Sequence, residues 1–275
     1  MKKYLKMLYS IIPFKRELYS LIKAIKTPQE TIYRHLHFKG AFLVKINDQK
    51  KFRLYNETFI ENEIFWEGIT GRWEKESMKL WIQLSKDSRF IIDIGANTGV
   101  YSLVAKTMNP DAEVFAFEPH PLFFEMLLKN VKINNININC INKAVSNFDG
   151  ELTIEDYSGA TPTIKANSVT LDKFIEQNKL KSIDLIKIDV ETFEPQVMQG
   201  FSQYLSQYRP TILIEILNEE VAQSINNMVS TFDYLYFNID ELGSVRQTTK
   251  IEKSDYYNYL LCNKMIAAKL GLNYN

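Results

Sequence analysis

The central part of the chain alternates between short apolar runs and stretches with apolar residues at helical spacing. Residues 90–94 form such a run, and Val100, Leu103 and Val104 follow at helical spacing, which predicts a strand, a tight turn and a helix. Strands that alternate with helices indicate a mostly parallel sheet whose ligands bind at the carboxyl ends of the strands. Further short runs that end at or beside an acid are residues 113–118, 183–191 and 210–216.

The flanking segments follow other patterns. Residues 41–46 and 51–55 are joined by a short polar turn, which predicts a β-hairpin. We therefore divide the chain into a basic helical and hairpin extension, residues 1–60, and a main domain, residues 61–275. In the main domain we predict a strand at residues 136–141, a loop over the substrate side at residues 155–168, and two final strands at residues 234–237 and 257–262.

The turn after residues 90–94 carries the first candidate chemistry. Gly95 and Gly99 allow backbone angles and close approaches that a Cβ would prevent, so a ligand can lie against the turn and the helix N-terminus. A dinucleotide-binding turn has a third glycine, whereas this turn has none and Asp93 stands just before it. The acid disfavours a pyrophosphate and favours a ligand that carries an ammonium group and a sulfonium.

A second acid supports a nucleoside pocket. Glu118 lies 19 residues after Gly99. This is near the spacing of about 20 residues at which a Rossmann-like unit places a carboxylate on ribose hydroxyls. Two acid-tipped strands joined by one helix are therefore expected to form an adenosine pocket.

Lys187 is unusual because it stands in an otherwise apolar strand. A buried cation is costly unless it is paired, so we expect Lys187 beside a carboxylate such as Asp93, Asp189 or Glu215. Two-residue alternation along the strand also predicts that Lys187, Asp189 and Glu191 point to one face.

The overall composition limits which binding partners and which cellular compartment are expected. The chain has 33 basic and 33 acidic residues, so no bulk charge points to nucleic acid. Cys140 and Cys262 lie far apart in apolar runs, which favours buried thiols in a reducing compartment. No apolar run approaches the ~18 residues of a membrane span. We therefore expect a cytoplasmic protein.

The charge is uneven at the N-terminus, where residues 1–26 carry seven basic residues and one acid. Two short amphipathic helices are predicted there. They either pack on the domain or on a second subunit of a homo-oligomer, or make a reversible peripheral contact with the anionic inner face of a membrane. Their apolar positions are Leu5, Leu8, Ile12, Leu18, Leu21, Ile22 and Ile25.

Five segments, in this order, resemble the FkbM family of S-adenosylmethionine-dependent methyltransferases over roughly residues 60–262. The resemblance implies an α/β, Rossmann-like class I methyltransferase fold. Its seven-stranded, mostly parallel sheet would have helices on both faces and an antiparallel last strand. The matching segments are residues 92–99, 116–121, 142–146, 170–172 and 183–191.

One position departs from the family pattern. The family usually has a glycine after Asp-Val-Glu, where this chain has Thr192. A β-branched residue does not easily adopt a positive φ. We therefore expect this turn to be shaped differently, which affects substrate alignment more than cofactor binding.

By this resemblance, the chain binds S-adenosylmethionine and releases S-adenosylhomocysteine. The glycine turn would cradle the methionine part, Glu118 would hold the ribose hydroxyls, and residues 142–145 would border the adenine. Asp189 would face the methionine end or the acceptor. The residues expected to bind the cofactor are Asp93, Gly95, Ala96, Asn97, Gly99, Glu118, Pro119, Asn142, Ala144, Val145 and Asp189.

The resemblance also suggests the reaction. A hydroxyl acceptor loses its proton as it attacks the methyl group, so a base within about 3 Å is needed. Asp189 and Glu191 are the first candidates and Glu215 the next, although the same acids serve equally well as partners of Lys187. These three acids are also of a type that holds Mg²⁺, but a metal site is not expected.

Family members mostly methylate hydroxyl groups of sugars or small natural products. A sugar hydroxyl in surface-glycan or natural-product biosynthesis is therefore the favoured acceptor. Two alternatives are a cofactor-binding protein without catalysis, which the Thr192 substitution supports, and a nicotinamide oxidoreductase, against which the two-glycine turn argues.

Overall fold

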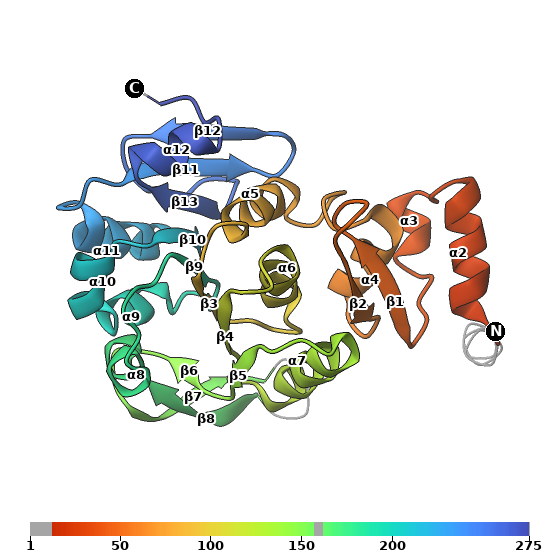
Figure 1. Ribbon diagram of the computed structural model, residues 1–275, viewed down its shortest axis with the longest axis horizontal. Helices are drawn as coiled ribbons and strands as arrows, with labels where there is room; N and C mark the ends of the chain where they lie inside the picture. Colours follow the sequence, from red (N-terminus) through yellow and green to blue (C-terminus); the bar gives the residue numbers. More distant parts are fainter. Residues whose placement is uncertain (1–12, 157–161, 275) are drawn as a thin grey trace. The chain divides into compact units, whose positions relative to one another are not determined.

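The computed structural model describes residues 13–156 and 162–274, which form two compact units (Figure 1). The first unit ends at Trp73. The sequence pattern places this boundary after residue 60, whereas the structure includes helix α4 (Phe59–Glu67) in the first unit. The difference arises because α4 contributes buried aromatic side chains to the core of that unit.

The N-terminal unit contains the predicted β-hairpin, which is confirmed. Its two strands pair antiparallel, and in the turn Asn47 Oδ1 accepts hydrogen bonds from the backbone N–H groups of Gln49 and Lys50. Thr58 and Glu61 form a capping box at the start of α4. The elements are α2 (Lys15–Ile25), α3 (Glu30–Tyr33), β1 (Ala41–Lys45), β2 (Lys51–Tyr55) and α4.

Aromatic side chains form the core of the N-terminal unit. The Tyr19 ring of α2 lies 5.7 Å from the Trp66 ring and 6.5 Å from the Phe38 ring, measured between centroids. The first predicted amphipathic helix, around Leu5 and Leu8, lies outside the described residues. Among the residues that are described, no helix is both long and apolar enough to cross a membrane.

The larger unit alternates strands and helices, as the sequence predicts. Its elements are α5 (Lys75–Ser85), β3 (Phe90–Ile94), α6 (Val100–Met108), β4 (Glu113–Phe117), α7 (Pro121–Asn134), β5 (Asn139–Ile141), β6 (Ala144–Val145), β7 (Gly150–Glu155), β8 (Thr163–Val169), α8 (Leu171–Asn178), β9 (Leu185–Ile188), α9 (Glu194–Gln199), α10 (Ser202–Tyr208), β10 (Thr211–Glu215), α11 (Glu219–Val229), β11 (Leu235–Asp240), β12 (Ser244–Thr248), β13 (Asn258–Cys262) and α12 (Lys264–Lys269).

The central sheet has eight strands in the order β12-β11-β13-β10-β9-β3-β4-β5. Strands β5, β4, β3, β9 and β10 run parallel, and β13 runs antiparallel to both β10 and β11. The expected mostly parallel sheet with an antiparallel last strand is thus confirmed. It has one strand more than the expected seven, because β12 pairs antiparallel with β11 at the edge of the sheet.

Helices cover both faces of this sheet (Figure 1). Helices α8 to α11 pack on the face that carries Ile92, Ile94 and Phe117, and α6 packs against β3 and β4 with α5 beside it. Because successive side chains of a strand point to opposite faces, Asp93 and Lys187 lie on the face opposite the α8–α11 core. Two buried charged side chains therefore project from this second face of the sheet.

The predicted loop at residues 155–168 is wrong. From Thr163 onward this segment is strand β8, which pairs antiparallel with β7 and parallel with β6 in a separate three-stranded sheet. Its buried positions, such as Ala166 and Ser168, alternate with exposed polar residues, so the apolar alternation is too weak to identify from the sequence. Residues 157–161 of the same segment lie outside the described residues.

Candidate functional site

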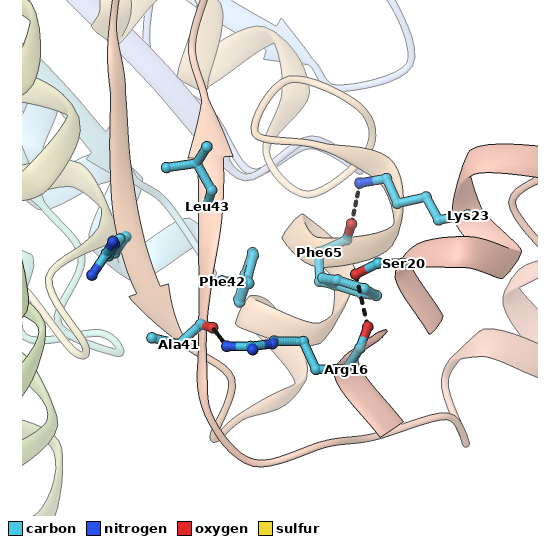
Figure 2. Close-up of a pocket in the computed structure, with 8 residues that line it drawn as sticks. Arg16, Ser20, Lys23, Ala41, Phe42, Leu43 and Phe65 are labelled. Atoms are coloured by element: carbon cyan, nitrogen blue, oxygen red, sulfur yellow. Dashed lines mark hydrogen bonds between the residues drawn. The ribbon is translucent and has the colours of Figure 1, made fainter. Parts of the chain in front are cut away.

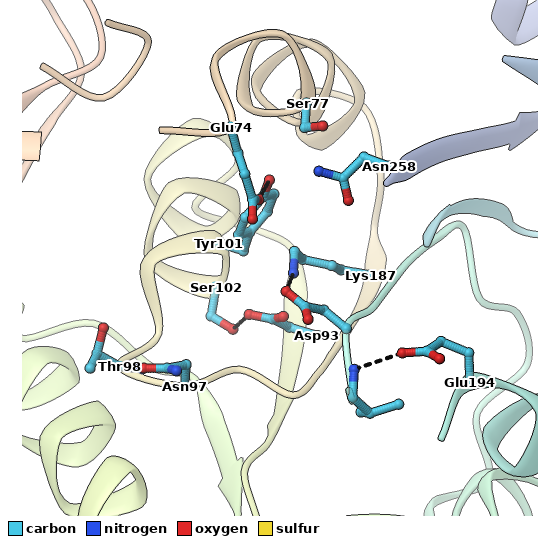
Figure 3. A network of polar contacts seen from close by, with 12 residues as sticks. Glu74, Ser77, Asp93, Asn97, Thr98, Tyr101, Ser102, Lys187, Glu194 and Asn258 are labelled. Atoms are coloured by element: carbon cyan, nitrogen blue, oxygen red, sulfur yellow. Dashed lines mark hydrogen bonds and ion pairs between the residues drawn. The ribbon is translucent and has the colours of Figure 1, made fainter. Parts of the chain in front are cut away.

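Strand register brings a buried lysine next to a buried acid at the carboxyl ends of the central strands. Asp93 of β3 is paired in register with Lys187 of β9, and their exposed fractions are 1% and 4%. Lys187 Nζ lies 2.6 Å from Asp189 Oδ2 and 4.4 Å from the centroid of the Tyr101 ring. The prediction that Lys187 lies beside a carboxylate is confirmed (Figure 3).

The protonation of Lys187 follows from its neighbours. Burial by itself lowers the pKa of a lysine, but the carboxylates of Asp189, Glu74 and Asp93 outweigh it and raise the pKa of Lys187 above its ordinary value. Lys187 is therefore a permanent cation surrounded by acids. Because three carboxyl groups face one ammonium group, this part of the site is suited to a further positive charge.

Asp93 has one oxygen that is paired and one that is not. Ser102 Oγ of α6 donates a hydrogen bond of 2.6 Å to Asp93 Oδ2. Asp93 Oδ1 is buried and has no hydrogen-bond partner among the described residues, and burial raises the pKa of this carboxyl group. A buried acceptor without a donor is uncommon in folded proteins, and it marks a position where a ligand's N–H group can bind.

The glycine turn serves the packing of the chain on itself. Gly95 and Gly99 adopt φ values of 80° and 88°. A Cβ on Gly95 would lie 1.8 Å from the backbone oxygen of Asp189, and one on Gly99 would lie 2.4 Å from a methyl group of Leu127. The two glycines are predicted to allow the close approach of a ligand; among the described residues, the atoms that approach them most closely belong to Asp189, just beyond β9, and to α7.

Glu118 is held in place by the backbone of two loops. Its Oε2 accepts a hydrogen bond of 2.8 Å from Asn97 N, in the glycine turn, and its Oε1 accepts one of 2.7 Å from His120 N. Asn142 Nδ2 donates to the carbonyl oxygens of Glu118 and Pro119 at 2.8 and 3.1 Å. Burial raises the pKa of the Glu118 carboxyl group to about 7 despite these donors.

His120 has a structural role. Its Nδ1 accepts a hydrogen bond of 3.3 Å from Leu122 N and so caps α7. Nε2 then carries the proton and donates to Asp156 Oδ1 at 3.1 Å. Both ring nitrogens of His120 therefore have partners within the protein.

Two of the predicted adenine-side residues, Ala144 and Val145, form the short strand β6 and are buried. The side chain of Val145 belongs to the large apolar core that α8 to α11 cover. At Val145 only the backbone therefore remains for a contact with a ligand. Ala96, in the glycine turn, is also buried.

Glu215 and Glu191 share the electrostatic surroundings of Asp189. Glu215 is the last residue of β10, and burial, together with the charge of Asp189, raises its pKa to about 9. Glu191 is exposed, and burial of part of its side chain and the same Asp189 charge raise its pKa. Strand β9 ends at Ile188 and Glu191 has a φ of 54°, so the predicted alternation does not extend to Glu191.

These acids are close enough to interact but do not form a metal site in the part of the chain that the structure describes. No group of three or more His, Cys, Asp or Glu side chains there is arranged to hold a metal ion. Asp189, Glu191 and Glu215 are thus not gathered as a three-ligand set.

The turn with the unusual threonine keeps a positive φ. Thr192 adopts a φ of 79°, so the expectation that a β-branched residue avoids this conformation here is wrong. Glu194 stabilises the turn through a hydrogen bond: its Oε1 accepts one of 3.1 Å from Val190 N. Burial raises the pKa of the Glu194 carboxyl group to about 7. The surrounding contacts therefore impose the strained conformation.

A second polar cluster was not predicted from the sequence. Tyr101 Oη of α6 donates a hydrogen bond to Glu74, the residue before α5, and burial raises the pKa of Glu74 to about 7. Glu241 accepts a hydrogen bond of 2.6 Å from Glu76 N and also pairs with the Ser77 hydroxyl group. These residues lie far apart in the sequence and follow no spacing rule, so only the folded chain brings them together (Figure 3).

Comparison with known proteins identifies the family of this chain. The model of a family described as the methyltransferase FkbM domain matches residues 93–243 of this chain, which is more than half of its 275 residues. The matched segment begins at Asp93 and contains Glu118, Lys187, Asp189 and Glu215.

Similar curated proteins are methyltransferases by name. The hexuronic acid methyltransferase AglP of Haloferax volcanii is 24% identical over 163 residues, which cover 56% of this chain and 66% of the relative. Methyltransferase 1 of Beauveria bassiana is 28% identical over 141 residues, which cover 49% of this chain and 55% of the relative. The match therefore spans somewhat less than two thirds of each relative's length.

The solved structures that resemble this chain include Methyltransferase FkbM from Methylobacillus flagellatus. It has a TM-score of 0.44 and 17% sequence identity, and the match covers 64% of this chain and 44% of that one.

Proposed function

This chain belongs to the FkbM methyltransferase family, and from that premise we propose that it transfers the methyl group of S-adenosylmethionine to a sugar hydroxyl group. When bound, the cofactor would supply an electrophilic methyl group on a sulfonium. The protein's task is to bind and orient the two reactants, exclude water and accept a proton. The excess of carboxyl groups over the single ammonium group of Lys187 at the ends of β3 and β9 is the observation that carries this proposal.

The residues of the site suit the cofactor's polar groups. The unpartnered Asp93 Oδ1 is an acceptor for an ammonium group. Glu118 has both oxygens anchored by backbone N–H groups, and each oxygen still has a lone pair for a ribose hydroxyl group. A cation beside Asp93 would lower the pKa of the surrounding carboxyl groups and keep them ionised.

We assign the proton acceptor to Asp189. Lys187 holds one of its oxygens at 2.6 Å, which orients the carboxylate. Glu215 is less suited, because a carboxyl group with a pKa of about 9 is protonated at neutral pH. Glu191 remains the alternative, since it lies two residues beyond Asp189 in the exposed turn.

A sugar hydroxyl group in a surface glycan or a natural product is the acceptor we favour. One relative is named a hexuronic acid methyltransferase, and it supplies the first acceptor class to test. We place the reaction in a reducing, cytoplasmic environment, because Cys140 and Cys262 are both free thiols.

The first experiment is calorimetric titration with S-adenosylhomocysteine. The parent protein and a Glu113→Gln variant should bind with the same affinity, since Glu113 is exposed at the opposite end of β4. Glu118→Gln, which keeps a hydrogen-bond acceptor for the backbone, should bind at least tenfold more weakly. If the parent protein does not bind S-adenosylhomocysteine, the proposed function is wrong.

The second experiment tests the base. Methyl transfer to glycans that contain hexuronic acids, and to neutral glycans, should be followed with the parent protein, Asp189→Asn and Glu191→Gln. Loss of a general base costs about 10²–10⁴-fold in rate, so Asp189→Asn should lower kcat by that factor while it leaves S-adenosylhomocysteine affinity within a few-fold. If Glu191→Gln has this effect and Asp189→Asn does not, the base is Glu191.

A further inference from the structure

Helix α2 presents two different faces, and the protein-facing one is the more polar. Arg16 Nη1 donates a hydrogen bond of 3.1 Å to the carbonyl oxygen of Ala41, and Lys23 Nζ donates to the carbonyl oxygen of Phe65. Between them Tyr19 is buried against Phe38 and Trp66. Figure 2 shows Arg16 and Lys23 reaching from α2 toward β1 and α4. These contacts fix the rotation of the helix about its axis.

The opposite face of α2 is apolar and exposed. Phe14, Leu18, Leu21 and Ile25 are spaced four, three and four residues apart, so they form one stripe along the helix. Their exposed fractions are 77%, 45%, 66% and 89%. A single exposed leucine needs no explanation, but a stripe of four large apolar side chains on one fixed helix face indicates a partner.

The charge around this stripe identifies the kind of partner. Residues 13–26 contain Lys15, Arg16, Lys23 and Lys26 against the single acid Glu17, a net charge of +3 in a chain whose overall formal charge is zero. Arg16 and Lys23 face the protein, and Arg16 also pairs with Glu17, so Lys15 and Lys26 are the basic residues near the two ends of the stripe. An apolar stripe with basic residues near its ends has the pattern of a helix that lies in the surface of an anionic bilayer.

We propose that α2 docks the protein on an anionic lipid surface, with the stripe of Phe14, Leu18, Leu21 and Ile25 inserted among the acyl chains. Lys15 and Lys26 then lie at the level of the lipid head groups. A second copy of the chain fits this stripe less well, because it would bring the same net positive charge of residues 13–26 against this one. The proposal is independent of the methyltransferase assignment.

Vesicle co-sedimentation of the full chain tests this surface. The parent protein should bind vesicles of phosphatidylcholine mixed with phosphatidylglycerol at least tenfold more tightly than vesicles of phosphatidylcholine alone, and added salt should weaken the binding. Leu18→Ser/Leu21→Ser should lower the affinity for the anionic vesicles at least tenfold. Leu242→Ser/Met265→Ser, which removes two equally exposed apolar side chains from the larger unit, should leave it unchanged.

The possible contrary results are distinct. Failure of the parent protein to bind anionic vesicles, or equal binding by both double variants, would overturn the proposal. A concentration-dependent dimer that Leu18→Ser/Leu21→Ser dissociates, in a parent protein that ignores vesicles, would assign the stripe to a second copy. Thermal unfolding followed by tryptophan fluorescence shows that each variant is folded. Titration with S-adenosylhomocysteine then separates a failure here from a failure of the cofactor assignment.

Discussion

The two units of this protein differ in which side chains lie in an unfavourable environment. The larger unit buries charged groups, among them Asp93, Glu118 and Lys187, at the carboxyl ends of its parallel strands. The N-terminal unit exposes an apolar stripe on α2. Each arrangement costs stability unless a ligand or a surface completes it. We therefore connect each arrangement with one of the two sites proposed above, the buried charges with a cation-bearing small molecule and the exposed stripe with lipid.

The largest effect is expected from removing the buried cation. Lys187→Met leaves Asp93, Asp189 and Glu74 without their shared counter-charge, and loss of one partner from a buried pair costs about 3–5 kcal/mol. Urea unfolding of the Lys187→Met variant should show a decrease of this size in the free energy of unfolding. In Lys165→Met, which breaks the exposed pair between Lys165 and Glu151, the loss of stability should be much smaller, because solvent screens an exposed ion pair. Equal losses in the two variants would mean that the buried cluster is not under electrostatic stress.

The second prediction concerns pH. The pKa values of Glu74, Glu118 and Glu194 are raised to about 7, and that of Glu215 to about 9. A carboxyl group whose pKa is higher in the folded state than its ordinary 4.5 contributes stability that is full below pH 4.5 and is lost as the pH rises through the folded value. The unliganded protein should therefore lose stability between about pH 5 and pH 9.

The slope of that loss can be assigned to single groups. Each extra proton held by the folded state contributes about 1.4 kcal/mol per pH unit. Glu215 holds such a proton from its ordinary pKa of 4.5 up to its folded value of about 9, so Glu215→Gln should lower the slope over this whole range. Well above pH 7, where the other three carboxyl groups no longer contribute, the curve of the variant should be nearly flat. S-adenosylhomocysteine, which brings an ammonium group, should restore stability at high pH. A stability that rises from pH 5 to pH 9 would contradict the raised pKa values.

A smaller effect is expected at the strained turn. Thr192 holds a φ of 79°, and a non-glycine residue in this region costs about 1–3 kcal/mol. Glycine removes that strain but adds about 0.5–1 kcal/mol of chain entropy to the unfolded state, so Thr192→Gly should stabilise the protein by about 1 kcal/mol. Thr192→Ala keeps a Cβ and should gain less. A destabilised glycine variant would show that the threonine side chain, rather than the fold, holds the turn.

A structural feature could be predicted from the sequence when residues close together in the chain determine it. The acid-tipped strands and the pairing of Lys187 follow from two-residue alternation and from the cost of an unpaired buried cation, so both were predictable. The contact between Tyr101 and Glu74 was not, because it depends on the packing of α5 beside α6. The tight packing at Gly95 was not predictable for the same reason: the atom that excludes a Cβ belongs to Asp189, a residue distant in the sequence.

The N-terminal unit shows the same limit. The spacing of Leu18, Leu21 and Ile25 predicts an amphipathic helix, but periodicity alone does not say whether the apolar face turns inward. That face turns outward here because Tyr19, on the other side of α2, supplies the aromatic contact with Trp66. One aromatic residue thus reverses the usual orientation of an amphipathic helix.

The smallest effect on stability is expected from the exposed stripe itself. Leu21 is 66% exposed, so Leu21→Ser should change the free energy of unfolding by less than about 0.5 kcal/mol. Tyr19→Ala, on the buried face of the same helix, should cost about 3–5 kcal/mol. Thermal unfolding followed by tryptophan fluorescence compares the two variants. If Leu21→Ser destabilises the unit as much as Tyr19→Ala does, the stripe is part of the protein's own core and the lipid-docking proposal loses its basis. A neutral Leu21→Ser that also binds anionic vesicles more weakly would separate the stripe's role in binding from any role in folding.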